Sequence, residues 1–427
     1  MSVMLKGRSA PGIGFVVFLL SIIMVVTVGA VMAIDTPPQR TTDYENGQLR
    51  SYPIEPEERW SLDLSDMRTY DAGATPLVAG TFEDTWLISY PSGLGNTYLA
   101  IDRRGGERLW PQPIDAGLGS CALNARGEVG CAVRLGDHPD GFYTAELDTG
   151  ELDSVSDLDS TQAVTGYGPD YLRVNSSGYQ VSRNTADGTE VWARTFAGAA
   201  TVEVDGDVAI VRASDGTQHL LDPATGDDRF GCSCDLVIYP TGIAAQFTER
   251  DAQRIEFLLP DGTSTSNNDK QQLVPGPSTL AVTTGAGSEQ IYQTQGTYAA
   301  YDPQQATRLW QVSEAELSKV GARPCGDTVA FARKDGTRAV LDLATADKLG
   351  ELPRSDPMSP STNIDILGCV GQGGNTIVFG GNSQLTAYNI ATGTVAWQRS
   401  VVGGQPAVVD GYLVLEEGTT LSLLAPS

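Results

Sequence analysis

The amino-acid sequence predicts an all-β domain built from repeated units, and two observations predict it. The chain is rich in turn-forming residues, with Gly 48 and Pro 23, while only 19% of its 427 residues are charged. This composition suits many short strands joined by tight turns rather than long surface helices. A short phrase also recurs: an apolar strand ending in Asp or Asn, a turn with Gly or small residues, and a strand carrying Trp or another large apolar residue.

The recurring phrase has the period of one β-propeller blade. The anchors Trp110, Leu152, Trp192 and Phe230 are 42, 40 and 38 residues apart, and a four-stranded blade takes about 40–50 residues. Asp or Asn closes each turn, Gly takes the positive φ, and the regular Trp spacing favours packing between blades over a ligand platform. The phrase occurs at residues 99–110, 145–152, 183–192, 220–230, 258–263, 300–310, 340–349 and 387–397.

The two ends of the repeat region are expected to pair and close a ring. Residues 58–64 resemble an outer strand, with Trp60, that has no blade before it, and residues 405–427 resemble inner strands with no outer strand after them. Pairing them removes exposed sheet edges. Eight phrases plus the closing blade give a literal count of nine. Because common propellers have about four to eight blades and residues 232–319 have weak strand signals, we expect eight blades.

The N-terminal segment predicts one membrane-spanning helix. Lys6 and Arg8 precede an apolar run at residues 13–33, and about 20 such residues cross a bilayer. The positive flank predicts a cytoplasmic N-terminus and an extracytoplasmic bulk. A signal peptide cleaved after Ala33 is the alternative, but the run exceeds the usual length of a signal core, which favours an uncleaved anchor.

These observations divide the chain into four parts. Residues 1–11 are expected to be a short cytoplasmic N-terminus, residues 12–34 a transmembrane signal-anchor helix, residues 35–56 a polar extracytoplasmic linker, and residues 57–427 the propeller. The formal net charge is −25, and because residues 1–34 contribute two positive charges and no negative one, the remainder carries −27. Such a surface repels nucleic acid and anionic lipid headgroups but attracts cations or basic partners.

The six cysteines of an exported domain predict three disulfides, although sequence alone allows 15 pairings. Cys121 and Cys131 flank a short loop that places them opposite one another on a hairpin. Cys325 and Cys369 each precede a turn and a strand at equivalent places in adjacent blades, where a bond can bridge the blades. Cys232 and Cys234 remain, and for them a structural bond is favoured over free thiols, a metal pair or a redox site.

The phrases resemble the repeats of the pyrroloquinoline-quinone-like propeller family, over about residues 57–427. That family includes the quinoprotein alcohol dehydrogenases and the protein-binding envelope lipoprotein BamB. The dehydrogenase branch implies adjacent bonded cysteines, a calcium ion and a catalytic aspartate. Here the nearest match is Cys232-Ser-Cys234, and no residue matches the calcium or catalytic positions. The resemblance therefore implies a binding or scaffolding role.

No motif predicts a catalytic, cofactor-binding or metal-binding residue. His138 and His219 are the two histidines, without paired-His spacing, and there is no EF-hand, phosphate loop or Gly-x-Ser-x-Gly. We therefore expect a single-pass protein of the cell membrane, and a non-enzymatic role is favoured. Its propeller would bind an envelope protein or ligand at one face, with no nucleic-acid partner and no cofactor. The alternative is a quinone- or metal-dependent oxidoreductase of the quinoprotein type.

Overall fold

The computed structural model describes residues 44–427, except for residues 66–75, 94, 156–157, 250–251, 286–295, 315–316, 355–363, 365, 382 and 402. The chain divides into two compact units, Met1–Gln39 and Arg40–Ser427, and all the described residues belong to the second unit. The predicted cytoplasmic N-terminus, transmembrane helix and first part of the linker lie outside the described residues. Within the described part of the chain, no helix is long and apolar enough to cross a membrane.

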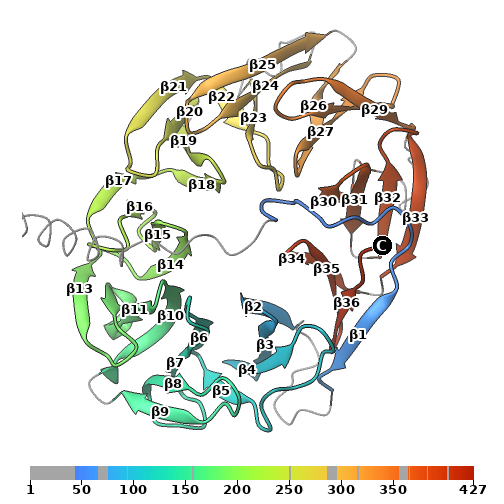
Figure 1. Ribbon diagram of the computed structural model, residues 1–427. Helices are drawn as coiled ribbons and strands as arrows, with labels where there is room; N and C mark the ends of the chain where they lie inside the picture. The colour runs from blue at the N-terminus through green and yellow to red at the C-terminus, as the bar shows by residue number, and fades with distance from the viewer. Residues whose placement is uncertain are drawn as a thin grey trace, which may run out of the picture. The chain divides into compact units, whose positions relative to one another are not determined.

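The described residues form nine four-stranded antiparallel sheets that succeed one another in chain order around a ring (Figure 1). We number these blades 1 to 9. In each of blades 1 to 8, four consecutive strands are hydrogen-bonded in sequence order, from the innermost strand to the outermost. The ring thus repeats one meander, in which each strand pairs only with its neighbours along the chain.

The first five blades take their strands from residues 77 to 269. Blade 1 contains β2 (Leu77–Phe82), β3 (Thr85–Ser92), β4 (Gly95–Asp102) and β5 (Ile114–Gly117); blade 2 contains β6 (Ser120–Leu123), β7 (Val129–Val133), β8 (Gly141–Ala145) and β9 (Leu152–Val155); blade 3 contains β10 (Thr161–Tyr167), β11 (Asp170–Asn175), β12 (Gln180–Asn184) and β13 (Glu190–Thr195), with the 3-10 turn η2 (Ser176–Gly178); blade 4 contains β14 (Ala200–Asp205), β15 (Val208–Ala213), β16 (Gln218–Leu221) and β17 (Asp228–Cys232); blade 5 contains β18 (Asp235–Tyr239), β19 (Gly242–Glu249), β20 (Ala252–Leu258) and β21 (Ser264–Asp269).

The remaining four blades complete the ring. Blade 6 contains β22 (Gln271–Leu273), β23 (Ala281–Gly285), β24 (Gly296–Asp302) and β25 (Thr307–Glu314); blade 7 contains β26 (Leu317–Cys325), β27 (Thr328–Arg333), β28 (Arg338–Asp342) and β29 (Lys348–Leu352); blade 8 contains β30 (Gly368–Gly373), β31 (Thr376–Gly381), β32 (Gln384–Asn389) and β33 (Thr394–Ser400); blade 9 contains β34 (Gln405–Val409), β35 (Tyr412–Glu417), β36 (Thr420–Leu424) and β1 (Glu58–Asp63).

The expectation of eight blades is wrong, and the literal count of nine is the number of sheets in the described residues. The difference arises between residues 232 and 319, where two complete blades lie. Strand β21 has the sequence STSNND and β22 has the sequence QQL, so neither shows the apolar alternation that marks a strand. Backbone pairing with the apolar strands β20 and β23 makes them part of their sheets.

The predicted closure of the ring is confirmed. Strand β1 pairs antiparallel with β36, so that Trp60 lies opposite Leu423 and Leu62 opposite Leu421. Blade 9 therefore takes three strands from the C-terminus and its outermost strand from the N-terminal side of the ring. No sheet edge between these two segments is left open, which is how closed rings avoid edge-to-edge aggregation.

Most of the repeat tryptophans join their own blade to the next. Trp110 Nε1 donates a hydrogen bond of 2.6 Å to the Leu147 carbonyl oxygen in blade 2. Gly150, at φ +71°, lies so close that an added Cβ would be 2.8 Å from the Trp110 ring. Three other tryptophans donate to the next blade in the same way: Trp60 to Arg103, Trp192 to Pro223 and Trp310 to Leu343. Trp397 of blade 8 donates instead to Tyr52, in the segment that precedes β1. The Trp and Gly of the phrase are thus two halves of one contact between blades.

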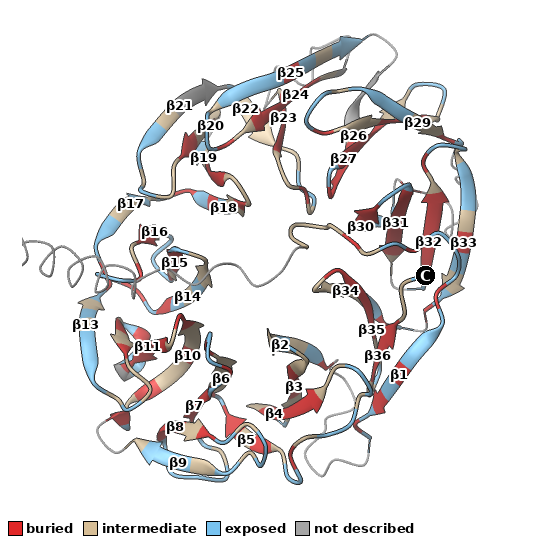
Figure 2. Ribbon diagram, in the orientation of Figure 1, coloured by how far each residue is buried: buried red, intermediate tan, exposed pale blue. Residues whose placement is uncertain are grey.

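Burial follows the order of strands within a blade. Figure 2 shows buried residues concentrated on the middle strands and exposed residues along the outer strands. In blade 4, for example, β15 is buried at almost every position, while the outer strand β17 is not. Both faces of a middle strand pack against neighbouring blades, which explains their continuous runs of apolar residues.

The turns define two faces of the ring. The first face holds the turns between the first and second and between the third and fourth strands of each blade. The second face holds the turns between the second and third strands and the links between blades. Asp410–Gly411, between β34 and β35, lies on the first face, and Leu118–Gly119, between β5 and β6, lies on the second.

Candidate functional site

The first face carries a segment of the chain's own N-terminal side. Residues 44–50, here called the bridging segment, are part of the predicted linker, and in Figure 1 they run toward the middle of the ring. They contact first-face turns, or strand ends beside them, in five blades. The contacts are Asn46 Nδ2 to the Ile238 carbonyl (3.3 Å), Gly47 beside Pro277, Gln48 Nε2 to Asp327 Oδ2 (3.0 Å), Leu49 N to the Gln372 carbonyl (2.7 Å) and Arg50 N to the Gly411 carbonyl (2.9 Å).

The bridging segment adds a short parallel strand to the inner edge of β30. Gln48 and Gln372 form a parallel bridge. Gln372 N donates to the Gly47 carbonyl at 2.8 Å, and Leu49 N donates to the Gln372 carbonyl at 2.7 Å. Thr279 Oγ1 also donates to Asp327 Oδ1 at 2.8 Å, so the carboxylate that accepts from Gln48 is itself held in place. This is recognition of an extended peptide by a sheet edge, within one chain.

Arg50 fixes the end of the bridging segment. Its guanidinium lies 4.6 Å from the Tyr44 ring centroid and 4.1 Å from the Tyr412 ring centroid, and its Nε donates to the Asp410 carbonyl at 3.1 Å. Arg103 approaches the same Tyr412 ring and donates to its hydroxyl at 2.8 Å. Burial raises the pKa of the neighbouring Asp410 carboxyl above its usual range. The bridging segment is therefore held by backbone pairing at one point and by cation–π contacts at another.

The second face presents two exposed leucines side by side, here called the leucine pair. Leu118 is 58% exposed and Leu135 is 77% exposed. Leu118 N donates to the Arg134 carbonyl at 2.7 Å, which joins the two loops. Large apolar side chains at such exposure, adjacent and on fixed backbone, are typical of binding surfaces.

The backbone under Leu135 is held in an unfavourable conformation. Its φ is +58°, which is costly for a branched side chain. Leu135 N donates to Asp140 Oδ1 at 2.8 Å, and Arg134 forms an ion pair with the same carboxylate at 3.1 Å. These bonds maintain the conformation that directs Leu135 outward. Asp137 is also exposed in this loop, so the leucine pair has an acidic border.

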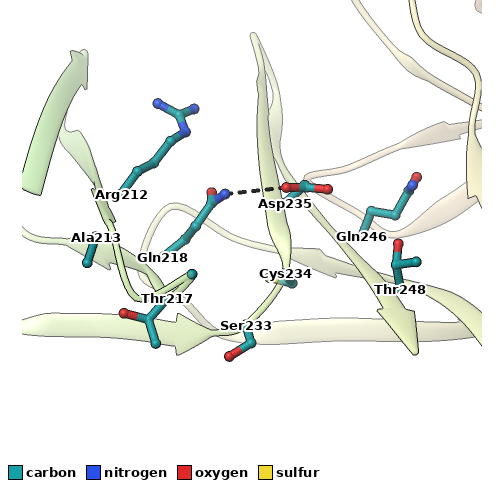
Figure 3. Close-up of a pocket in the computed structure, with 10 residues that line it drawn as sticks. Arg212, Ala213, Thr217, Gln218, Ser233, Cys234, Asp235, Gln246 and Thr248 are labelled. Carbon is teal, nitrogen blue, oxygen red and sulfur yellow. Dashed lines mark hydrogen bonds between the residues drawn. The ribbon is translucent and has the colours of Figure 1, made fainter. Parts of the chain in front are cut away.

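A cleft of about 270 Å³ lies between blades 4 and 5, on the second face (Figure 3). Gln218 Oε1 accepts from Leu236 N at 3.0 Å, and its Nε2 donates to Asp235 Oδ1 at 3.5 Å. Gln246 likewise accepts from Leu273 N of blade 6 at 2.7 Å. The polar groups of this cleft thus serve partly as cross-links between blades. The other lining residues are Arg212, Ala213, Gly216, Thr217, Ser233, Cys234 and Thr248.

The six cysteines form three disulfides, in the pairs expected from the sequence. Cys121–Cys131 joins paired residues of β6 and β7 within blade 2. Cys325–Cys369 joins the inner strands of blades 7 and 8, with a sequence separation of 44. Cys232–Cys234 closes across one residue in the link between blades 4 and 5.

The two histidines lie in different blades, His138 in blade 2 and His219 in blade 4. His138 packs against the Tyr143 ring at 5.8 Å between centroids, and His219 lies 3.2 Å from Asp228 and packs against Phe196. Over the described ranges, no three or more His, Cys, Asp or Glu side chains lie where they could hold a metal ion together. Sequence reasoning missed the leucine pair, Leu118 and Leu135, because a Leu in a loop has no pattern that distinguishes it from a core Leu.

The fold defines the class: the described residues form an all-β propeller of nine four-stranded blades. No protein family model and no curated protein matches the chain. Among solved structures, BamB from Moraxella catarrhalis is similar at 14% identity and a TM-score of 0.42, covering 86% of this chain and 99% of that one. A computationally designed protein, Ika8, is similar at 14% identity and a TM-score of 0.41, covering 88% and 99%. At these scores neither likeness informs function, and membership of the quinone-like family stays a prediction.

Proposed function

We propose that this protein is a membrane-anchored, extracytoplasmic module that binds or scaffolds cell-envelope proteins. Residues 12–34 serve as the anchor, with Lys6 and Arg8 on the cytoplasmic side. The length of the apolar run supports a span, and the two positive charges before it support this orientation. Three disulfides suit an oxidising compartment outside the cytoplasm.

The leucine pair is the observation that carries the binding proposal. Leu118 and Leu135 are exposed while their backbones are fixed by hydrogen bonds. Because these loops are already ordered, little conformational entropy is lost when a partner covers the two leucines. A few apolar side chains on a rigid backbone can then contribute most of the binding free energy. The bridging segment occupies part of the first face, which favours the second face as the docking surface.

The charge of the protein indicates the chemistry of the partner. The chain beyond residue 34 carries −27, and Asp137 borders the leucine pair. A partner with an apolar side chain flanked by Lys or Arg would bury the leucines and meet acidic groups at the rim. Such charge complementarity mainly raises the association rate and excludes acidic proteins.

The proposal is tested by co-purification from solubilised membranes. Leu135→Glu should reduce recovery of the partner about ten-fold or more, because a charge replaces an apolar anchor. Leu309→Glu is the matched control, since Leu309 lies on the outer strand β25 and is 39% exposed. Equal recovery with Leu135→Glu and with the unaltered protein would show that the leucine pair does not bind the partner.

The anchor is tested separately by fractionation. The intact chain should remain with the membrane after a high-salt wash, and external protease should reach the propeller. Removal of residues 1–34 should release it into the soluble fraction. A soluble form of the unaltered protein that begins at Ile34 would show instead that the segment is a cleaved signal.

A further inference from the structure

We propose that the Cys232–Cys234 disulfide is a thiol–disulfide exchange site for a protein dithiol, and that the cleft beside it admits the attacking thiol. Cys232 is the last residue of β17, and Cys234 immediately precedes β18. The bond therefore lies in the link between blades 4 and 5, on the second face. This inference rests on the extracytoplasmic location in the proposed function, but not on binding at the leucine pair.

The Cys232–Cys234 bond contributes little as a staple. Its sequence separation is 2, whereas those of the other two bonds are 10 and 44. A cross-link restricts the unfolded chain less as the loop it closes becomes shorter. A short link between blades also forms without a disulfide. Leu118–Gly119 connects blades 1 and 2 with the same number of residues, and Lys270 alone connects blades 5 and 6. Stability therefore does not account for this bond.

The bond is accessible from one side. Ser233 is exposed, Cys232 is half-buried, and Cys234 is 7% exposed but lines the cleft of about 270 Å³. The other side of Cys234 packs in the core between the blades, against Leu236 and Ile243 among others. A thiol can thus reach Cys234 from the side of the cleft.

The lining of the cleft suits a stretch of extended polypeptide. Figure 3 shows Gln218, Asp235, Gln246 and Thr248 around the opening, with Ser233 and Cys234 on the loop beside them. Amide and hydroxyl groups can donate to and accept from a peptide backbone without demanding a particular side chain. The substrate class is therefore an exported protein with two nearby cysteine thiols.

The exchange balances in two steps. A substrate thiolate attacks Cys234 Sγ, the Cys232–Cys234 bond breaks, and its electron pair leaves on Cys232 Sγ, which takes a proton from water. The second substrate thiolate then attacks the substrate sulfur of the mixed disulfide and releases Cys234 as a thiol after protonation. The substrate dithiol is oxidised to a disulfide, and Cys232 and Cys234 are reduced to two thiols. A low-molecular-weight disulfide in the same compartment returns them to the bonded form.

The test measures which bond is reduced first. The full chain in detergent is treated with one equivalent of dithiothreitol, free thiols are blocked with iodoacetamide, and the labelled peptides are quantified by mass spectrometry. Cys232 and Cys234 should carry at least ten-fold more label than either Cys121–Cys131 or Cys325–Cys369. Label spread evenly, or found first on another pair, would overturn the proposal.

A second measurement tests the route of attack. Thr248→Trp fills the cleft from an exposed strand position and should slow reduction of Cys232–Cys234 about ten-fold without lowering the melting temperature. Thr201→Trp is the matched control, since Thr201 is exposed on β14 and does not line the cleft. An unchanged rate in Thr248→Trp would show that the thiol does not enter through the cleft.

Discussion

Trp110 of blade 1 donates the hydrogen bond of its indole to the Leu147 carbonyl of blade 2, across 2.6 Å. The donor stands at the end of one repeat, and the acceptor stands in the turn of the next. The same relationship recurs for Trp60, Trp192 and Trp310. The recurring phrase in the sequence therefore indicates contacts between blades rather than the folding of a single blade.

Two substitutions at Trp110 should distinguish the stability contributed by burial of the ring from that contributed by its hydrogen bond. Trp110→Ala should destabilise the ring by about 3–5 kcal/mol, because a large buried ring is lost. Trp110→Phe keeps most of the apolar surface and should cost about 1 kcal/mol for the missing hydrogen bond. Chemical denaturation monitored by fluorescence of the remaining tryptophans measures both values.

The glycine on the other side of the contact offers a control. An added Cβ at Gly150 would be 2.8 Å from the Trp110 ring, whereas at Gly216 it would meet nothing within 4 Å, although both have positive φ. Gly150→Ala should therefore lower the free energy of unfolding more than Gly216→Ala does, and the difference is due to the contact with the Trp110 ring. Equal costs would show that the packing of Gly150 against Trp110 is unimportant.

The disulfide between blades 7 and 8 should act as a staple. Cys325 and Cys369 close a loop with a sequence separation of 44, and chain-entropy arithmetic gives such a loop about 4 kcal/mol at most. The double change Cys325→Ser with Cys369→Ser should lower the melting temperature while partner binding persists at low temperature. The reduced, unaltered protein should melt no higher than this variant. A melting temperature unaffected by the double change would contradict the staple role.

The raised pKa of Asp410 makes a prediction about pH. Burial disfavours the ionised form, so the folded protein binds this proton more tightly than the unfolded chain does. The contribution of Asp410 to stability is therefore largest at acid pH and falls as pH rises from the unfolded pKa through the folded one. Asp410→Asn should raise the melting temperature at pH 7, with a smaller gain at acid pH.

Asp215 supplies the opposite case. Hydrogen bonds from Thr217 hold the pKa of its carboxyl below the usual range. The contribution of Asp215 to stability is present above the pKa that its carboxyl has in the unfolded chain. That contribution is lost as pH falls through its pKa in the folded protein. Asp215→Asn should therefore lower, not raise, the melting temperature at pH 7. If Asp410→Asn lowers the melting temperature at pH 7 as Asp215→Asn does, the assignment for Asp410 is wrong.

The ring itself was predictable because its signals are local. The Asp-to-Trp phrase repeats every blade, and the unpaired strand at Trp60 matches the missing outer strand at the C-terminus. The number of blades was harder to predict, because β21 and β22 are polar. Backbone pairing with β20 and β23 makes them strands. Sequence patterns report the faces of strands, and they report backbone pairing only indirectly.

The candidate sites were predictable only in part. Two of the cysteine pairs were predicted from hairpin and repeat geometry, and Cys232 and Cys234 were the two that remained. The bridging segment did not, because its contacts join residues 44–50 to five blades hundreds of positions away in sequence. Leu135 gave no signal either, since its positive φ and its exposure depend on Asp140 and on the neighbouring loop at Leu118. Sites made by loops from different repeats require the fold before they can be seen.

Photo-crosslinking in intact cells tests the central claim most directly. A benzoylphenylalanine at position 135 samples the second face, and one at Glu83 samples an exposed first-face turn of blade 1. We expect one envelope protein crosslinked from position 135, little from position 83, and loss of that product when Leu118→Glu is added. A product of equal yield from both positions, or one that persists with Leu118→Glu, would contradict the claim that the leucine pair is the binding surface.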